Sequence, residues 1–410
     1  MNKPTLFARR TLLLSALVLA VLAAAAALFA WPQIRARLPG ASQPPLRLEW
    51  IWRKNIDKAE AVALAASFNG ERLAAAVTSS ASGAERRFVY GMDNESRLFT
   101  VFEAADLREL QLDGSGRALL TQDASGALKF LADWQTESGK PVALGVAAAG
   151  AQLAPGRRSV LARAPGPQGS WRLLDAAGAA AQNLADSPAG ETLRAWYPFL
   201  ERPTLAALAY ADGRLQLYEG TQRVQAHQFD APLLAAASGV LSNQLLAVVA
   251  GKAPARLFLL ADDGGRPLGM WSLPAAVERV SLACGQLGQA CALLAVNGER
   301  RLLYVVSAQG RLLSQHEGGG AGVERVEFGD EGRMLVAAFE AQGQWSLHAW
   351  DLEGRVLWSA PIEGRLVDFR LSWSGKRLMA VTGEGKVLYF DTERRRPAKV
   401  SEAPRGARPG

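Results

Sequence analysis

The sequence predicts an all-β protein, an eight-bladed β-propeller that follows one N-terminal transmembrane helix. Short apolar segments typical of strands alternate with turn dipeptides such as Asn69-Gly70 and Ser374-Gly375. A unit of this kind begins about every 43 residues between Val62 and Leu366, which is within the range of a four-stranded propeller blade. A single long apolar segment without charges precedes these units.

That apolar segment comprises residues 11–31 and follows a basic tail, residues 1–10. Twenty-one residues make a helix of about 31 Å, which is enough to cross a bilayer. The segment continues to the interfacial residue Trp31 and is followed by Arg35 and Arg37, which favours a retained signal anchor. A cleaved signal peptide is the alternative.

The orientation of the anchor does not follow from its flanking charges, because three basic residues lie on each side. A ten-residue tail before a large body is the usual layout of an export signal. We therefore expect a single-pass protein of the bacterial inner membrane with its propeller in the periplasm. A body that faces the cytoplasm is the alternative.

The remaining segments divide into a stalk, a body and a tail. Residues 32–47 contain four prolines and predict an extended stalk. Residues 48–393 hold the repeats and form the expected propeller. Residues 394–410 have no periodicity and are rich in Arg and Pro, which predicts a basic, disordered tail.

The charges are concentrated at the two ends of the chain. The 410 residues are 49% hydrophobic and 21% charged, which argues against wholesale disorder and against a polytopic membrane protein. The net charge is +7, yet residues 1–47 hold six basic and no acidic residues, and residues 394–410 hold six basic and one acidic. The body between them is left with −4, so no nucleic-acid partner is expected.

The blades can be placed from the repeat, which is clearest in residues 323–364 and 365–393. Each unit begins with an apolar strand, a glycine turn and a second strand. The innermost strands are expected near Ala61, Leu107, Gly145, Thr192, Leu234, Val277, Val323 and Leu366. This count gives eight blades, with seven as the alternative.

The last unit stops after its third strand, whereas an extra strand at residues 46–57 precedes the first unit. If this strand completes the last blade, the ring closes and leaves no strand edge open. Tryptophans recur in segments of this kind, and we expect them to pack between blades: Trp50, Trp52, Trp271 and Trp358.

Two segments resemble known propellers. Residues 371–392, LSWSGKRLMAVTGEGKVLYFDT, resemble a WD repeat, and residues 347–358, LHAWDLEGRVLW, resemble blades of quinoprotein-like propellers and of the outer-membrane assembly lipoprotein BamB. The resemblance implies this propeller superfamily and is a weak guide to function. The chain lacks a Cys near its apolar segment for BamB-type lipidation, and it lacks the adjacent Cys pair of quinone-dependent dehydrogenases.

No catalytic, metal-binding or cofactor-binding residue is predicted. The sequence has no G-x-S-x-G elbow, no phosphate-binding loop, no G-x-G-x-x-G that opens a helix and no H-E-x-x-H. The three histidines, His227, His316 and His348, lie in different blades without ligand spacing, and we expect them to be packed or solvated. No cofactor and no small-molecule ligand are expected.

Cys284 and Cys291 are the only cysteines and form the one candidate constellation. Alignment of Val277-ERVSL with Val323-ERVEF predicts a turn about three residues longer than in the following blade, with the thiols on facing strands of a hairpin. A disulfide there would add about 2 to 3 kcal/mol in an oxidising compartment. The alternative is two buried free thiols that pack as small apolar residues.

A rigid disc that presents loops on both faces is suited to recognition. The sequence therefore predicts a non-catalytic scaffold or adaptor, whose partners are other envelope or membrane proteins. One alternative is a quinoprotein-like enzyme or small-molecule binder that uses the central channel. The other is the same scaffold facing the cytoplasm.

Overall fold

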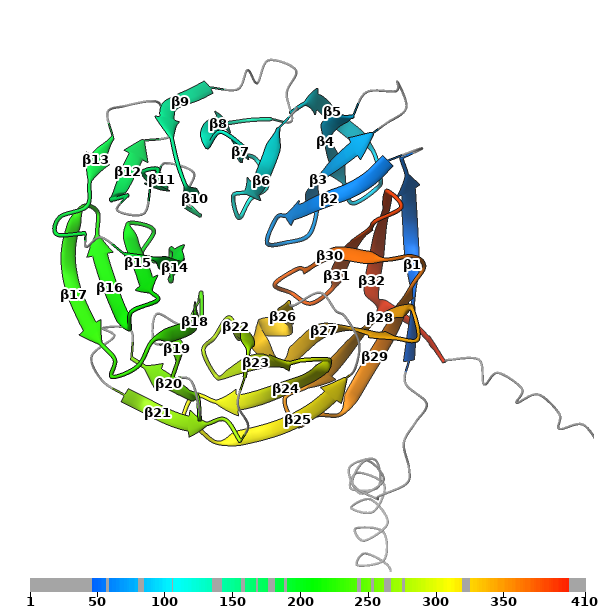
Figure 1. The fold of residues 1–410 in the computed structure, drawn as a ribbon. Coiled ribbons are helices and arrows are strands. Elements are labelled where there is room, and N and C mark those ends of the chain that lie inside the picture. The colour runs from blue at the N-terminus through cyan, green and yellow to red at the C-terminus, as the bar shows by residue number, and fades with distance from the viewer. Residues whose placement is uncertain are drawn as a thin grey trace, which may run out of the picture. The chain divides into compact units, whose positions relative to one another are not determined.

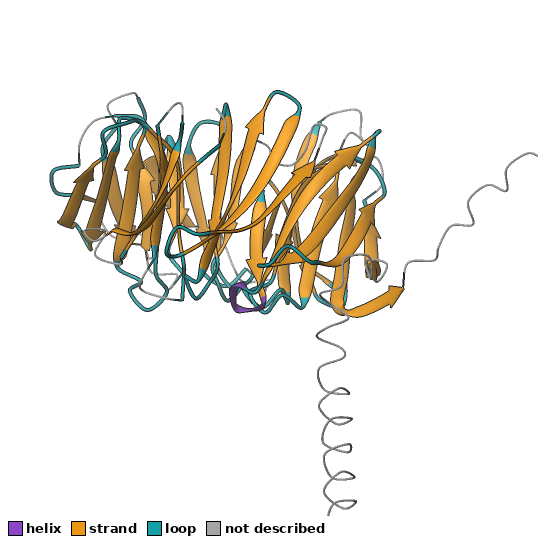
Figure 2. Cartoon of the chain, turned by 90° about the horizontal axis from the view of Figure 1, so that it is seen from below, coloured by secondary structure: helices purple, strands orange, loops and turns teal. Residues whose placement is uncertain are grey.

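Eight blades are arranged in a ring around a central channel, and each extends outward from it (Figure 1). The computed structural model describes residues 46–397, apart from residues 57–58, 80–84, 105, 135–141, 156–158, 167–168, 176–180, 188–189, 242–244, 252–253, 262–266, 275–276 and 319–324. From the side the ring is a disc with loops on both faces, and one face carries the 3-10 turn η1 (Asp330–Gly332) (Figure 2).

Four-stranded antiparallel sheets make up the first half of the ring. Blade 1 contains β2 (Ala59–Ala66), β3 (Arg72–Ser79), β4 (Arg86–Asp93) and β5 (Leu98–Glu103). Blade 2 contains β6 (Leu107–Leu112), β7 (Leu119–Asp123), β8 (Ala127–Leu131) and β9 (Val142–Ala147). Blade 3 contains β10 (Gly150–Leu153), β11 (Ser159–Arg163), β12 (Trp171–Asp175) and β13 (Gln182–Asn183). Blade 4 contains β14 (Thr192–Trp196), β15 (Leu205–Tyr210), β16 (Arg214–Glu219) and β17 (Gln222–Gln228).

The second half repeats the arrangement. Blade 5 contains β18 (Leu233–Ser238), β19 (Leu246–Ala250), β20 (Arg256–Leu260) and β21 (Pro267–Ser272). Blade 6 contains β22 (Arg279–Cys284), β23 (Ala290–Asn297), β24 (Arg300–Ser307) and β25 (Leu312–Gly318). Blade 7 contains β26 (Val326–Gly329), β27 (Met334–Ala341), β28 (Gln344–Asp351) and β29 (Val356–Ile362). Blade 8 contains β30 (Leu366–Leu371), β31 (Arg377–Thr382), β32 (Lys386–Pro397) and, from the start of the described chain, β1 (Leu46–Asn55).

β1 joins the two ends of the ring. It is hydrogen-bonded to β32, and the Ile56 N–H that follows it donates to the Gly385 carbonyl. The first residues of β1 also pair in parallel with β29, with the backbone of Leu46 in register with that of Trp358. Blades 7 and 8 therefore form one continuous eight-stranded sheet, and the last blade gains an outer strand from the start of the propeller.

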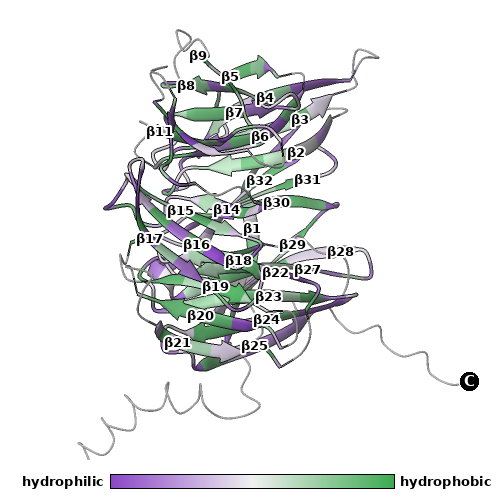
Figure 3. Cartoon of the chain, turned by 60° about the vertical axis from the view of Figure 1, so that its left-hand side comes forward, coloured by the Kyte–Doolittle hydropathy of each residue, from purple (hydrophilic) through white to green (hydrophobic). Residues whose placement is uncertain are grey.

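The core is divided into layers between neighbouring blades. Figure 3 shows apolar residues concentrated in the strands. Between blades 8 and 1, Leu73 and Val77 pack against Val381 and Tyr389 in one buried cluster. The Tyr389 hydroxyl also donates to the Gly70 carbonyl, at 3.1 Å. The repeat therefore specifies both the blades and the apolar layers that join them.

The prediction of an all-β, eight-bladed propeller is confirmed, and the seven-bladed alternative is excluded. One innermost strand was misplaced. The segment expected to begin blade 3 near Gly145 is β9, the outer strand of blade 2, and β10 begins at Gly150. Only two residues separate these strands, so the spacing of the repeat did not resolve them. Five of the six residues of β9 alternate between exposed and half-buried, as an outer strand does.

The four tryptophans differ in their surroundings. Trp358 is fully buried and Trp271 is half-buried against Tyr304, with ring centroids 4.9 Å apart. Trp50 was expected to pack between blades, and that expectation is wrong. Its side chain is 45% exposed because it lies on the outermost strand of blade 8, where Arg53 covers its ring. The side chain of Trp52 lies outside the described residues.

The expected anchor (11–31) and most of the stalk (32–47) lie outside the described residues. Within the described part of the chain, no helix has the length and apolar character needed to span a membrane. β1 begins at residue 46, which was assigned to the stalk, and β32 includes residues 394–397, which were assigned to the basic tail.

Candidate binding site at the channel mouth

A cavity of about 530 Å³ lies where the innermost strands of all eight blades end. It is bounded by the ends of these strands and by the loops that join the first and second strands of the blades, here called the mouth loops. One of these loops contains η1, which identifies the face of the disc (Figure 2). The lining residues that carry the argument below are Phe68, Arg194, Trp196, Arg325, Glu327 and Trp373.

Polar side chains at the channel form hydrogen bonds between neighbouring blades. The innermost strand of a blade has one edge that no strand pairs with, so its backbone groups need other partners. Gln111 donates to the Ala151 carbonyl of the next blade at 2.9 Å and accepts from the Leu153 N–H at 2.9 Å. Gln286 donates to the Phe328 carbonyl at 2.7 Å. These side chains satisfy backbone groups of the adjacent inner strand.

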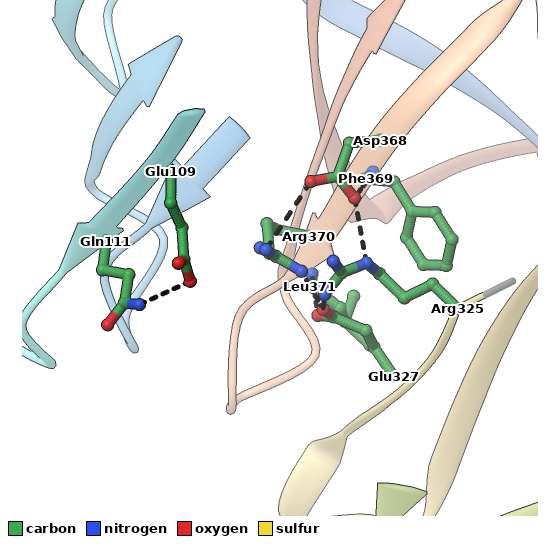
Figure 4. A network of polar contacts seen from close by, with 8 residues as sticks. All are labelled: Glu109, Gln111, Arg325, Glu327, Asp368, Phe369, Arg370 and Leu371. Atoms are coloured by element: carbon green, nitrogen blue, oxygen red, sulfur yellow. Dashed lines mark hydrogen bonds and ion pairs between the residues drawn. The ribbon is translucent and has the colours of Figure 1, made fainter. Parts of the chain in front are cut away.

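The densest polar cluster joins blades 7 and 8 (Figure 4). Arg325 binds Asp368 at 2.9 Å through Nε and Glu327 at 3.3 Å through Nη1. Arg370 binds Glu327 at 3.1 Å and lies 3.6 Å from Asp368. Residues two apart on a strand face the same side, so an Arg-x-Glu segment meets an Asp-x-Arg segment with every charge opposite its complement. The four charges sum to zero, and we call these residues the channel network.

Enclosure by protein raises the pKa of both acids of the network, Glu327 and Asp368. Burial raises the pKa of Glu327 to about 7, although Arg325 and the Leu371 N–H, which donates to Glu327 at 2.8 Å, act in the other direction. Burial also raises the pKa of Asp368, against the opposing effect of Arg325. Loss of solvent thus outweighs the ion pairs at both carboxyl groups.

Replacement of Glu327 by Gln is expected to weaken the pH dependence of stability. The pKa of Glu327 is about 7 in the folded chain against an ordinary value of 4.5, so the folded state binds its proton more tightly. The stability that this adds is fully present below pH 4.5 and is lost as the pH rises through 7. The free energy of unfolding, measured in urea at pH 5 and pH 8, should fall less between these pH values in Glu327→Gln than in the native chain.

The matched control is Glu363→Gln, since that side chain is 68% exposed and lies outside the channel network. The control should lose as much stability between the two pH values as the native chain. An equal loss in Glu327→Gln would contradict the raised pKa.

Arg194 lies outside the channel network. Its Nη1 donates to the Ala236 carbonyl of blade 5, at 2.5 Å, and its guanidinium lies over the Trp196 ring, 5.4 Å from the centroid. Burial lowers the pKa of Arg194 to about 10, and the positive charge of Arg325 adds to this shift. No carboxylate of the described residues forms an ion pair with it. Sequence reasoning missed Arg194 because the fourth repeat is too degraded to align.

Aromatic rings border the cavity on the side of blades 8 and 1. Phe68 and Trp373 occupy equivalent positions in two mouth loops and stack with centroids 3.5 Å apart. Their backbones are linked as well, because the Trp373 N–H donates to the Phe68 carbonyl and the Phe68 N–H donates to the Gly114 carbonyl, both at 2.8 Å. The mouth therefore combines an apolar wall with arginine on the opposite side of the ring.

The candidate cysteines lie beside the same cavity. Cys284 and Cys291 face each other directly on β22 and β23 with Cα atoms 4.0 Å apart, and the structure joins them in a disulfide. Cys284 is also a lining residue of the cavity.

The turn between the two cysteines was expected to be about three residues longer than that of the following blade, and this length is wrong. Five residues, 285–289, separate β22 from β23, and four, 330–333, separate β26 from β27, so the difference is one residue. β22 begins at Arg279, whereas the aligned Arg325 precedes β26. The repeated sequence thus stands at different positions in the two inner strands.

Reduction of the bridge is expected to lower the free energy of unfolding by about 2 kcal/mol, a modest amount because the bridge closes a short loop. The double variant Cys284→Ala/Cys291→Ala should be insensitive to the reductant. The measurement is urea unfolding with and without reductant. Alkylation of both thiols in the native, unreduced chain would contradict the bridge.

The histidines lie away from the cavity, on outer strands. His316 on β25 and His348 on β28 meet around Trp350, with ring centroids 4.6 and 5.7 Å from the indole. Burial lowers the pKa of both. His227 on β17 lies near Phe229. The sequence placed these histidines in separate blades but did not reveal the contact of two of them across blades 6 and 7.

Among the described residues, no group of three or more His, Cys, Asp or Glu side chains is arranged to hold a metal ion. The cavity offers guanidinium groups, carboxyl groups and aromatic faces. These groups can bind charged and aromatic parts of a ligand.

No family model and no curated protein matches the sequence. The fold is similar to solved β-propellers over 84% of this chain. The Dos1 propeller matches over 95% of its own chain with a TM-score of 0.61 and 13% identity. Sqt1 from Chaetomium thermophilum, bound to the N-terminus of ribosomal protein L10, matches over 100% of its own chain with a TM-score of 0.60 and 16% identity. BamB from Moraxella catarrhalis matches over 97% of its own chain with a TM-score of 0.54 and 16% identity. At such identities the likeness shows the fold alone.

Proposed function

We propose that the chain is a non-catalytic scaffold whose propeller binds other envelope or membrane proteins. The observation that supports this most is the architecture of the mouth. Inner strands of eight blades end around an open cavity, and hydrogen bonds between neighbouring inner strands and mouth loops hold several of these loops in place. Loops held by a rigid frame are suited to recognition. One similar propeller, Sqt1, has a protein segment bound in its structure.

The proposal includes attachment to the bacterial inner membrane through residues 11–31, with the propeller in the periplasm. The length and flanks of this apolar segment support the anchor. The paired cysteines on facing strands support an oxidising compartment. A reporter that is active only outside the cytoplasm, fused after residue 410, should be active. Activity of a cytoplasm-specific reporter at the same position would overturn the orientation.

The test of the scaffold is purification of the full chain in mild detergent, with identification of the proteins that accompany it and their stoichiometry. We expect an envelope protein in fixed ratio to the chain. The alternative function is a small-molecule binder that uses the channel, which the size of the cavity favours. A monomer that carries a bound small molecule and no protein would support that alternative and overturn the scaffold.

A further inference from the structure

The four charges of the channel network sum to zero, but the positive charge of Arg194 at the same cavity has no acidic partner among the described residues. Arg325 and Arg370 are both engaged with the two carboxyl groups of the network. Asp113, the remaining acid that lines the cavity, directs its carboxylate into its own mouth loop, where it accepts from the N–H groups of Arg117 and Ala118. Among the described residues that line the cavity, no acid is therefore left for Arg194.

Arg194 is held in position while part of its donor capacity stays open. A guanidinium has five N–H groups, and the structure assigns one hydrogen bond to this one, from Nη1 to the Ala236 carbonyl. Stacking over Trp196 fixes the plane of the group. Protein surrounds Arg194 on the channel wall, but the residue keeps accessible surface toward the cavity that it lines, so its remaining donors can be reached from the channel.

Apolar side chains line part of the cavity. Trp196 lies beside Arg194, and the half-buried, stacked rings of Phe68 and Trp373 lie across the ring. A volume of about 530 Å³ is within the range of sites that hold an organic ligand and is larger than one side chain needs. An arginine among apolar walls forms charge-assisted hydrogen bonds with a carboxylate, and these are stronger than those with a neutral amide.

We propose that the cavity binds an extended acidic segment of a partner protein, with a Glu or Asp side chain on Arg194 and a neighbouring aromatic or aliphatic side chain against the apolar walls. This inference rests on the proposed function, because it names the chemistry that the partner presents. The charge of Arg194 and the absence of an acid opposite it in the described cavity select a carboxylate. The apolar walls select its neighbour along the segment.

The experiment is calorimetric titration of the full chain in detergent with three peptides. The first is acetyl-Ala-Glu-Phe-Ala-amide, the second has Gln in place of Glu, and the third is the Gln peptide with a free carboxyl terminus. We expect the Glu peptide to bind at least about tenfold more tightly than the Gln peptide, and its affinity to fall with added salt. Tighter binding of the third peptide than the first would overturn the side-chain assignment in favour of a terminal carboxylate.

Two variants locate the effect. Arg194→Gln should reduce the affinity for the Glu peptide about tenfold and leave the Gln peptide unchanged. The matched control is Arg223→Gln, which removes the same charge from the same blade but lies on the outer strand β17, paired with Asp186. Equal affinities for the Glu and Gln peptides, no binding of either, or an unchanged affinity in Arg194→Gln would each overturn the proposal.

The failure of this inference and the failure of the scaffold give different results. If Arg194→Gln still purifies with an envelope protein in fixed ratio while the peptides do not bind, the scaffold stands and the acidic segment is wrong. If the Glu peptide binds but the native chain purifies without any protein, the carboxylate site stands and the scaffold is wrong.

Discussion

Replacement of Leu48 by Asp is expected to lower the free energy of unfolding by at least about 4 kcal/mol, because it places an unpaired charge in a closed core. Leu48 lies on β1 in a buried cluster with residues of both blades that meet at the closure, such as Val336 of blade 7 and Phe369 of blade 8. A charge there separates β1 from the cluster. The ring then loses the strand that completes blade 8.

The measurement is urea unfolding of the full chain in detergent, with Ile51→Asp as the control on the same strand. The Ile51 side chain is 37% exposed, so the same new charge should cost less than about 1 kcal/mol there. If Leu48→Asp does not fold, Leu48→Ala should still fold and lose about 2 to 3 kcal/mol. Equal stability of Leu48→Asp and Ile51→Asp would contradict closure by β1.

Replacement of Trp134 by Ala is expected to cost about 3 to 5 kcal/mol, because it leaves a large cavity between blades 1 and 2. The Trp134 side chain is fully buried, its Nε1–H donates to the Gly116 carbonyl at 3.1 Å, and its ring meets Phe99 of blade 1 edge-to-face at 4.9 Å. The backbone of Gly91 approaches the ring so closely that an added Cβ would lie 2.7 Å from it. Neighbouring atoms therefore cannot fill the space without rearrangement.

Trp50→Ala is the control for the loss of an indole, since Trp50 is largely exposed on β1. It should change the free energy of unfolding by less than about 1 kcal/mol. Thermal unfolding followed by circular dichroism separates the two variants. A loss in Trp134→Ala no larger than in Trp50→Ala would contradict the packing between blades 1 and 2.

The number of blades could be predicted because contacts between neighbouring blades recur at the length of the repeat. The bonds from Trp196 to Ser238 and from Gln286 to Phe328 each span 42 residues. Such spacing survives degradation of the sequence, since each blade has to offer similar strands at similar intervals. The position of a single strand is less constrained, which is why the start of blade 3 was misplaced by about five residues.

The channel network left a signal in the sequence that the repeat alone did not interpret. Arg325 and Glu327 stand 43 residues before Asp368 and Arg370, so matching positions in two units carry opposite charges. Which of the two alternating faces of an inner strand points into the channel becomes known only when the ring is assembled. Burial of tryptophan depends on assembly in the same way, because Trp358 and Trp50 occupy similar sequence patterns but only Trp358 is covered by a neighbouring blade.

The claim that the mouth loops bind a partner protein is tested most directly by site-specific photo-crosslinking in intact cells. A photoreactive residue at Leu287, in the mouth loop of blade 6, is compared with one at Val224 on the outer strand of blade 4. Both side chains are apolar, with exposed fractions of 48% and 54%. The scaffold account predicts one crosslinked partner from position 287 and none from position 224. The acidic-segment inference predicts in addition that this crosslink is lost in Arg194→Gln. Crosslinks only from position 224, or from neither position, would contradict the scaffold account.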